Sequence, residues 1–103
     1  VFLGANLTGT DFSKSDAIRC TFDKADLTGA NLTYAILARA SFTGAKLDKS
    51  NWAKTYLYRT DLSGTDLSGV TGLTQGQIAE ACGDDKTTLP EGLTPPASWP
   101  CSE

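Results

Sequence analysis

The sequence predicts an all-β solenoid built from five-residue units, and two interlocked patterns carry this prediction. In the first pattern, a large apolar residue occupies every fifth position. In the second, the residue two positions before a large one is small: at all thirteen such positions from Ala5 to Thr65 it is Ala, Ser, Thr or Cys. An amphipathic helix would bring apolar residues back after three and four positions, so a period of five argues against a helix. The large apolar residues fill fourteen consecutive slots, of which only Ala17 is small: Phe2, Leu7, Phe12, Ala17, Phe22, Leu27, Leu32, Leu37, Phe42, Leu47, Trp52, Leu57, Leu62 and Leu67.

These patterns describe a chain that turns after every few residues and points one large and one small side chain inward. The positions between them carry Asn, Asp, Thr, Ser and Gly, as in ADLTGANLT and TDLSGTDLSG, which suit exposed tight turns. Burial of each large side chain is worth roughly 1.5 to 3 kcal/mol, so the inward column is the main stabilising contribution. Because each coil covers its neighbour, only the two ends of such a stack need a cover.

The A(D/N)LxG pattern of Ala25-Asp26-Leu27-Thr28-Gly29 and of Ala30-Asn31-Leu32 resembles the pentapeptide-repeat proteins. The resemblance covers roughly residues 1–71 and implies a right-handed, quadrilateral parallel β-helix with four pentapeptides in each coil. Residues twenty positions apart should then stack in columns about 4.8 Å apart. The expected columns are Phe2–Phe22–Phe42–Leu62, Leu7–Leu27–Leu47–Leu67, Phe12–Leu32–Trp52 and Ala17–Leu37–Leu57.

The chain divides into a repeat region, residues 1–73, and a tail, residues 74–103, that packs on it as part of one domain. The tail begins with a predicted short helix, in which Thr74 is the N-cap, Gln77 completes a capping box and Gly83 stops the helix. Leu73, Ile78 and Ala81 would cover the open end of the last coil. The Pro-rich remainder predicts an irregular strap anchored by Leu89, Leu93 and Trp99.

Two of the three cysteines, Cys82 and Cys101, bracket this strap and suggest a disulfide. A closed loop of about twenty residues would add roughly 3 kcal/mol in the chain-entropy model. The bond would imply an oxidising compartment, periplasmic or secreted, whereas two reduced thiols would fit a cytoplasmic protein. Cys20 falls in a small inward slot and is expected to be a buried filler.

We predict that the untreated protein gains the mass of two hydrogens when a reductant opens the Cys82–Cys101 bond. Intact mass with and without reductant measures this directly. Two alkylatable thiols at this pair in untreated protein would contradict the hypothesis.

Charge and composition exclude several functions. Residues 1–73 hold eight Lys and Arg against seven Asp and Glu, and residues 74–103 hold one against five. The repeat region therefore has neither the cationic excess of a nucleic-acid binder nor the long acidic surface of a DNA mimic. The chain contains no His and no paired-cysteine metal motif, and its Ser, Thr and Asp residues lack catalytic partners. We expect no catalytic residues, no metal and no cofactor.

One surface departs from the polar pattern. The slot two positions after each large residue holds seven cations among fourteen, and the twenty-residue stacking aligns three of them, Arg19, Arg39 and Arg59. Ile18, Ile36, Tyr56 and Tyr58 lie beside them, with Lys14, Tyr34 and Lys54 in the next column. This side is either an interaction face for an anionic partner or a solvated stripe whose charge Asp16 and Asp61 offset.

The sequence thus predicts a non-enzymatic structural or interaction module that presents rigid faces to an unknown protein or anionic polymer, without direct nucleic-acid binding. The resemblance offers an alternative, because some pentapeptide-repeat proteins mimic duplex DNA and modulate type II topoisomerases.

A homodimer could form through an end of the solenoid, near Val1 and Phe2, or through the Tyr/Arg face. The tail is similar to those of bacterial relatives. No stretch is long and apolar enough to span a membrane. Because the chain begins in mid-repeat, we expect further residues upstream in the natural protein.

Overall fold

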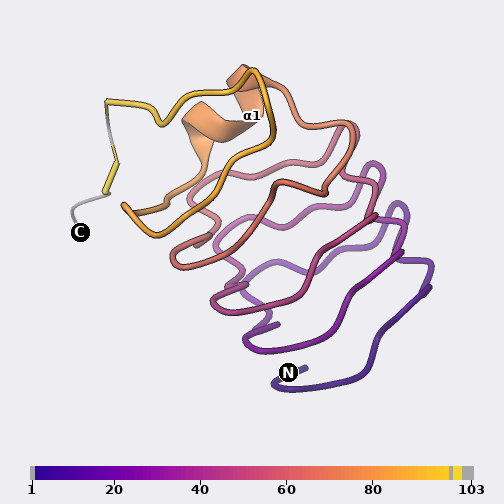
Figure 1. The fold of residues 1–103 in the computed structure, drawn as a ribbon. Helices are drawn as coiled ribbons and strands as arrows, with labels where there is room; N and C mark the ends of the chain where they lie inside the picture. The colour runs from indigo at the N-terminus through magenta and orange to yellow at the C-terminus, as the bar shows by residue number, and fades with distance from the viewer. Residues whose placement is uncertain (1, 98, 101–103) are drawn as a thin grey trace.

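The computed structural model describes residues 2–97, 99 and 100, and it shows a stack of four-sided coils. Parallel bridges join residues twenty positions apart, from Asn6 with Asp26 to Asn51 with Thr71. Figure 1 shows the coils stacked from the N-terminal end toward the tail. Twenty residues per coil are four pentapeptides, so the columns expected from the sequence are confirmed. Each side of a coil supplies a single bridging residue, because the chain turns again before a longer strand can form.

The backbone hydrogen bonds of one pentapeptide explain why it repeats so regularly. In residues 26–30, Asp26 N donates to Ala5 O of the preceding coil at 2.9 Å, while Leu27 N and Gly29 N donate to Lys46 O and Asp48 O of the next coil at 2.8 and 2.9 Å. The turn is closed by Ala30 N, which donates to Leu27 O at 2.9 Å. Thr28 N, the fifth donor, is bonded to Asp26 Oδ1 at 3.1 Å. Every N–H of this repeat therefore has a partner, as a protein interior requires.

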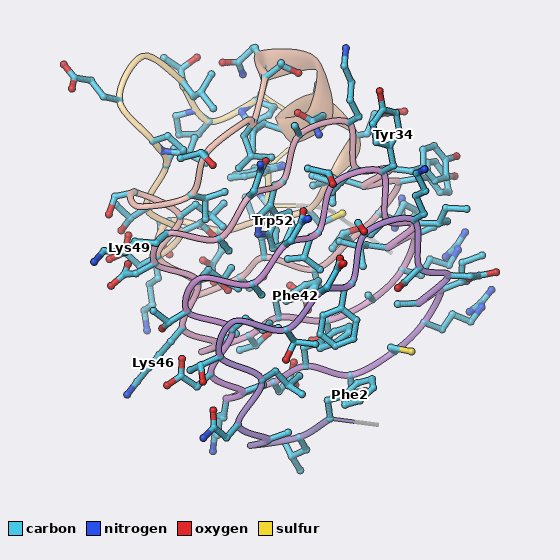
Figure 2. All side chains as sticks on the ribbon, turned by 90° about the vertical axis from the view of Figure 1, so that its right-hand side faces the viewer. Phe2, Tyr34, Phe42, Lys46, Lys49 and Trp52 are labelled. Carbon is cyan, nitrogen blue, oxygen red and sulfur yellow. The ribbon has the colours of Figure 1, made fainter. Side chains whose placement is uncertain are left out.

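The large side chains form continuous columns through the core. The rings of Phe2, Phe22 and Phe42 are stacked with centroids 5.0 and 4.7 Å apart, and Trp52 packs on Phe42 at 5.0 Å. Figure 2 shows Phe2, Phe42 and Trp52 following one another along the stack. Trp52 is fully buried, and its Nε1 donates to Ser50 Oγ at 2.9 Å. The narrow coil thus accommodates an indole because a small inward residue supplies its hydrogen-bond acceptor.

The Asp and Asn residues before the large slots close the turns with their side chains. Asp11, Asp61 and Asp66 accept hydrogen bonds from the backbone N–H two residues later at 2.9 to 3.0 Å, and Asn31 does so at 3.1 Å. These are the Asx turns for which these two residue types are favoured. Carboxylates in this position therefore bond to the backbone and help to close the turn.

The tail starts with α1, Gln75–Glu80, and its capping box is confirmed. Thr74 N donates to Gln77 Oε1 at 2.8 Å, and Gln77 N donates to Thr74 Oγ1 at 3.3 Å. The amide of Gln77 also donates to Trp52 O at 3.1 Å and to Thr55 O at 3.2 Å, which ties α1 to the repeat coil below it. Ile78 of the same helix is fully buried.

Gly83 was expected to stop the helix, and this expectation is wrong. The helix ends at Glu80 with Ala81 as its C-cap, because the following chain becomes extended and Cys82 forms a parallel bridge with Asp61. Gly83 is required for a different reason, since a Cβ at this position would lie 2.5 Å from Cζ3 of the Trp99 ring. The indole Nε1 of Trp99 donates to Ala81 O at 2.8 Å, so the strap folds back onto the end of α1.

The Asx turns predict a dependence of stability on pH. Hydrogen bonds from the hydroxyl and N–H groups of Ser13, Thr28 and Ser68 lower the pKa values of Asp11, Asp26 and Asp66, respectively, from their ordinary value of 3.8. A carboxyl group whose pKa is lower in the folded state stabilises the protein above the unfolded pKa. This contribution is lost as the pH falls through the folded pKa.

We therefore expect the free energy of unfolding to fall between about pH 5 and pH 2, and a triple Asp11→Asn, Asp26→Asn and Asp66→Asn variant to lose less over that range. Asn keeps the acceptor oxygen, as Asn31 shows with Thr33 N at 3.1 Å, but does not titrate. Urea unfolding of both proteins across this range measures the difference. Equal slopes for the two proteins would contradict the prediction.

Candidate interaction face

Seven of the eight cations of the repeat region lie at the corners of the coils, in a backbone conformation that disfavours them. Non-glycine residues with φ between 54° and 62° are Lys14, Arg19, Lys24, Tyr34, Arg39, Lys49, Lys54 and Arg59. Most other corners are occupied by glycines with positive φ, such as Gly29 at 72°. Only glycine, and to a lesser degree Asn and Asp, adopts this left-handed conformation readily. The corner position therefore fits glycine best, and seven of these eight exceptions are Lys or Arg.

The twenty-residue stacking sorts these corners into two kinds. Two corner columns are mostly glycine, Gly4–Lys24–Gly44–Gly64 and Gly9–Gly29–Lys49–Gly69. The other two carry only long side chains, Lys14–Tyr34–Lys54 and Arg19–Arg39–Arg59. The side of the solenoid between the last two columns is lined by Asp16, Ile36 and Tyr56, which are joined by parallel bridges.

We call the surface formed by Arg19, Arg39, Arg59, Ile18, Ile36, Tyr56 and Tyr58 the Arg/Tyr face. The structure brings these sequence-predicted residues together on one side. Ile18, Ile36, Tyr56, Tyr58 and the adjoining Tyr34 are each 38 to 59% exposed, and of the described large apolar residues that are exposed only Leu3 lies elsewhere. In Figure 2, Lys46 and Lys49 project from the side opposite Tyr34. Exposed apolar side chains are thus concentrated on the side that also carries the arginine column.

The aromatic and cationic groups of this face touch one another. The rings of Tyr56 and Tyr58 lie 6.4 Å apart and nearly parallel, at 14°. The guanidinium carbon of Arg39 lies 5.5 Å from the centroid of the Tyr58 ring, within the range of a cation–π contact. Tyr58 therefore helps to hold one arginine of the column in place.

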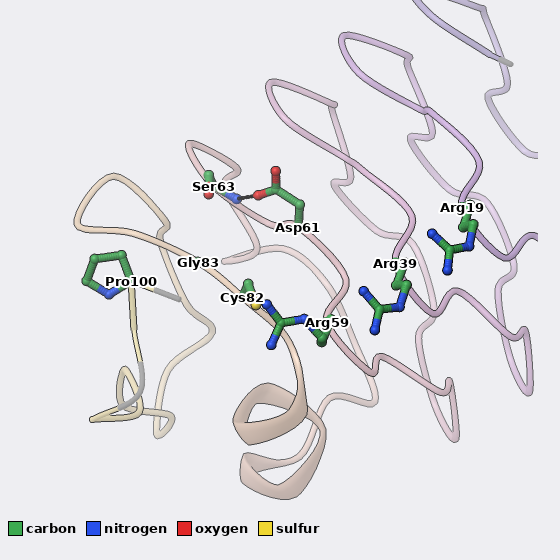
Figure 3. A pocket seen from close by; sticks show the side chains of 8 residues that line it. All are labelled: Arg19, Arg39, Arg59, Asp61, Ser63, Cys82, Gly83 and Pro100. Carbon is green, nitrogen blue, oxygen red and sulfur yellow. Dashed lines mark hydrogen bonds between the residues drawn. The ribbon is translucent and has the colours of Figure 1, made fainter. Parts of the chain in front are cut away.

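The arginine column forms one wall of a hollow of about 390 Å³ at the junction between the solenoid and the tail. Figure 3 shows the three arginine side chains extending in the same direction from successive coils. Asp61 and Ser63 line the hollow from the last coil, and Asp61 Oδ1 accepts a hydrogen bond from Ser63 N at 3.0 Å. Cys82, Gly83 and Pro100 complete it from the tail. Three guanidinium groups and the carboxylate of Asp61 are thus the charged groups among the described residues that line the hollow.

The sequence did not predict that Cys82, Gly83 and Pro100 of the tail would line this hollow, because the tail has no repeat that indicates where it lies. The arginine column itself follows from the spacing of twenty. Of the two cysteines expected to be bonded, Cys101 lies outside the described residues, so the disulfide stays a hypothesis. Cys20 is a free cysteine and is only partly buried, since its slot belongs to the first, open coil.

The carboxylates named above are engaged in turns, and no group of three or more His, Cys, Asp or Glu residues within the described part of the chain could hold a metal ion. Among residues 2–97, 99 and 100, no helix has the length and apolar character needed to cross a membrane.

Backbone conformation predicts opposite effects for two glycine substitutions, one at a corner and one in α1. Gly29→Ala should destabilise the protein by about 1 kcal/mol through backbone conformation. A Cβ at Gly29 meets no atom within 4 Å, so no steric clash contributes. Gly76→Ala in α1 should stabilise it by up to about 1 kcal/mol, because alanine is the better helix former.

Lys54→Gly should be stabilising by up to about 1 kcal/mol, because it relieves the same corner strain. Urea unfolding of the three variants and the parent protein measures all of these effects. A loss of stability in Lys54→Gly would show that its side chain contributes more to the fold than its corner conformation costs.

The solved structures to which this chain is similar include three pentapeptide repeat proteins. A pentapeptide repeat protein from the thylakoid lumen of Arabidopsis thaliana is 24% identical, with a TM-score of 0.39, and the match covers 86% of this chain and 61% of that protein. Rfr23 from the cyanobacterium Cyanothece 51142 is 22% identical, with a TM-score of 0.31 and coverage of 84% and 54%. HetL from the cyanobacterium Nostoc sp. strain PCC 7120, involved in the regulation of heterocyst differentiation, is 22% identical, with a TM-score of 0.23 and coverage of 85% and 46%. The chain thus spans about half to three fifths of the length of these proteins.

The family comparison is more direct. A search of curated proteins found no match. The family model of the pentapeptide repeat region matches residues 1–71, which includes the whole run of regular corners and bridges. The family implies a right-handed β-helix solenoid, in agreement with the stacked four-sided coils. On this match, the chain belongs to the pentapeptide repeat family.

Proposed function

We propose that this protein is a non-enzymatic interaction module and that its Arg/Tyr face binds a protein or polyanionic partner. The observation that carries the proposal is the coincidence, on one side of the solenoid, of the all-arginine corner column and most of the exposed large apolar residues. Scattered exposed apolar residues need no explanation, whereas a group rimmed by charges is typical of a binding surface.

The solenoid suits this role because it holds the face rigidly. The N–H groups of two arginine corners are bonded to the next coil, Arg19 N to Ala38 O and Arg39 N to Tyr58 O, both at 2.9 Å. A partner that binds successive corners would therefore order few backbone atoms, which lowers the entropic cost of association.

We further propose that α1 and the strap cap the last coil. Arg59 N donates to Glu80 O and Leu62 N to Cys82 O, both at 2.7 Å, so the tail occupies the positions of a further coil. This cover would prevent other chains from pairing with the edge. The disulfide hypothesis and the oxidising compartment that it implies belong to the same proposal.

The alternative of a DNA-mimicking topoisomerase modulator has less support. Mimicry of DNA requires an extended negative surface, whereas the most distinctive face of this solenoid carries three arginines. A supercoiling assay with type II topoisomerase and added protein distinguishes the two functions, since inhibition or protection would favour the alternative.

The proposal predicts that an Arg19→Gln, Arg39→Gln and Arg59→Gln variant loses most of its capture of native partners. The measurement is affinity capture from extracts of the source cells, with quantification by mass spectrometry. A Lys24→Gln, Lys46→Gln and Lys49→Gln variant is the matched control, because it removes the same charge from three exposed cations elsewhere on the solenoid. Equal capture by both variants and the parent would argue against the face as the binding site.

A further inference from the structure

The cations of the Arg/Tyr face lie at corners whose backbone conformation glycine adopts more readily. Arg19, Arg39 and Arg59 have φ values of 62°, 59° and 54° at corners where glycine would be free of strain. Neighbouring corner columns show that this fold accepts glycine there, as at Gly4, Gly44 and Gly64. A column of three arginines is therefore not explained by the needs of the backbone, and its chemistry has to be sought in what the side chains bind.

From this column and its neighbours we infer that the Arg/Tyr face binds an acidic amphipathic α-helix of a protein partner, lying along the solenoid axis. The inference deepens the proposed function and depends on it, because it names the kind of partner. It is drawn from three features of the face, namely its spacing, its apolar strip and its charge.

The spacing of the column suits a helix. Strands of neighbouring coils are about 4.8 Å apart, and the stacked rings of Phe2, Phe22 and Phe42 follow at 5.0 and 4.7 Å. Residues three and four apart on an α-helix are separated by about 4.5 and 6 Å along its axis, so acidic residues at i, i+3 or i+4, and i+7 would meet successive arginines. In an extended peptide, side chains on one side are about 6.7 Å apart and would fall out of step.

The apolar strip beside the column favours an amphipathic partner over a uniformly charged polymer. Ile36 and Tyr56 are bridged neighbours on successive coils, and Tyr58 lies against Tyr56 and Arg39. An apolar stripe next to the acidic stripe of a helix would bury these side chains while its carboxylates engage the arginines. A polyanion without apolar groups would leave the strip exposed to water.

The charges of the face fit the same arrangement. The arginines present planar groups that bind carboxylates with two hydrogen bonds, and the hollow beside them can receive such carboxylates. Asp16, whose Oδ1 accepts a hydrogen bond from Ile18 N at 3.2 Å, is the exposed acid in the Ile36 and Tyr56 column, and Asp61 lies in the hollow. Asp16 would oppose a partner that is negative on every side, but not one whose acidic stripe follows the arginines. Asp61 shares the hollow with the arginines, so the acidic stripe would engage mainly Arg19 and Arg39, which lie on earlier coils than Asp61.

Designed peptides test the inference on the unaltered protein. The probe is a peptide of about 21 residues, long enough to form a helix in water. It has a seven-residue repeat with Glu at the first and fifth positions, so that Glu falls at i, i+4 and i+7 along one stripe, and with Leu in the adjoining stripe. Three comparisons are needed: a peptide of the same composition with scrambled order, the same peptide with Gln in place of the striped Glu, and heparin as a polyanion without an apolar stripe. Fluorescence anisotropy should show binding of the striped peptide, with at least about tenfold weaker binding of the scrambled and Gln peptides.

Protein variants locate the binding site. Arg19→Gln with Arg39→Gln should weaken binding of the striped peptide by about tenfold, and so should Ile36→Ser with Tyr56→Ser. The matched controls are Lys24→Gln with Lys49→Gln, which removes the same charge from corners of the other two columns, and Leu3→Ser, which removes an exposed apolar residue elsewhere. These controls should change the affinity by less than about twofold.

Several results would overturn the inference: equal binding of the scrambled peptide, binding of heparin without binding of the striped peptide, or an equal loss in the lysine control. If the striped peptide fails to bind but native capture still depends on the three arginines, the proposed function stands and the acidic helix is wrong. If native capture is also independent of the arginines, both proposals fail.

Discussion

The turn that closes each pentapeptide is the constraint on which the rest of this structure depends. The small residue donates its N–H to the carbonyl of the large residue three positions earlier, as Ala30 does to Leu27 at 2.9 Å, and this tight bend brings both side chains to the inside. The bend leaves the residue before the small one in the left-handed conformation, as at Gly29. Three of the remaining N–H groups are directed at the neighbouring coils, and the fourth, that of Thr28, bonds to Asp26 of its own repeat. The core columns, the bridges and the corners all follow from this one local closure.

The regular part of the fold could be predicted from the sequence because each position in the pentapeptide has one structural role. A large residue such as Phe42 is inside, a small one such as Ala45 is inside beside it, and a polar one such as Asp61 faces outward. No long-range information is needed beyond the number of repeats per coil, which the family resemblance supplied. With that number, the sequence alone places Arg19, Arg39 and Arg59 in one column.

The tail could be predicted only where its signals are local. Thr74 and Gln77 are close in sequence and form the expected capping box. The pairing of Asp61 with Cys82 and of Asp66 with Thr88 was not predictable, because the separation increases from twenty to 21 and then to 22 residues after α1. The same holds for Gly83, whose missing side chain makes room for an indole sixteen positions later in the chain. Such contacts depend on how an irregular segment folds back, and no periodic pattern records that.

The twenty-residue register also constrains how a protein of this kind can change its length. Loss or gain of one pentapeptide would keep every large residue inside and so preserve the core, but it would rotate all later corners by one side of the square. Arg39 would then leave the column of Arg19, and the strip of Ile36 and Tyr56 would be divided between two sides. A surface built across coils is therefore preserved only when the inserted or deleted segment is a whole coil of four pentapeptides, whereas the core tolerates insertion or deletion of a single pentapeptide. Comparison of repeat numbers among related proteins would consequently separate the lineages that keep such a surface from those that keep only the fold.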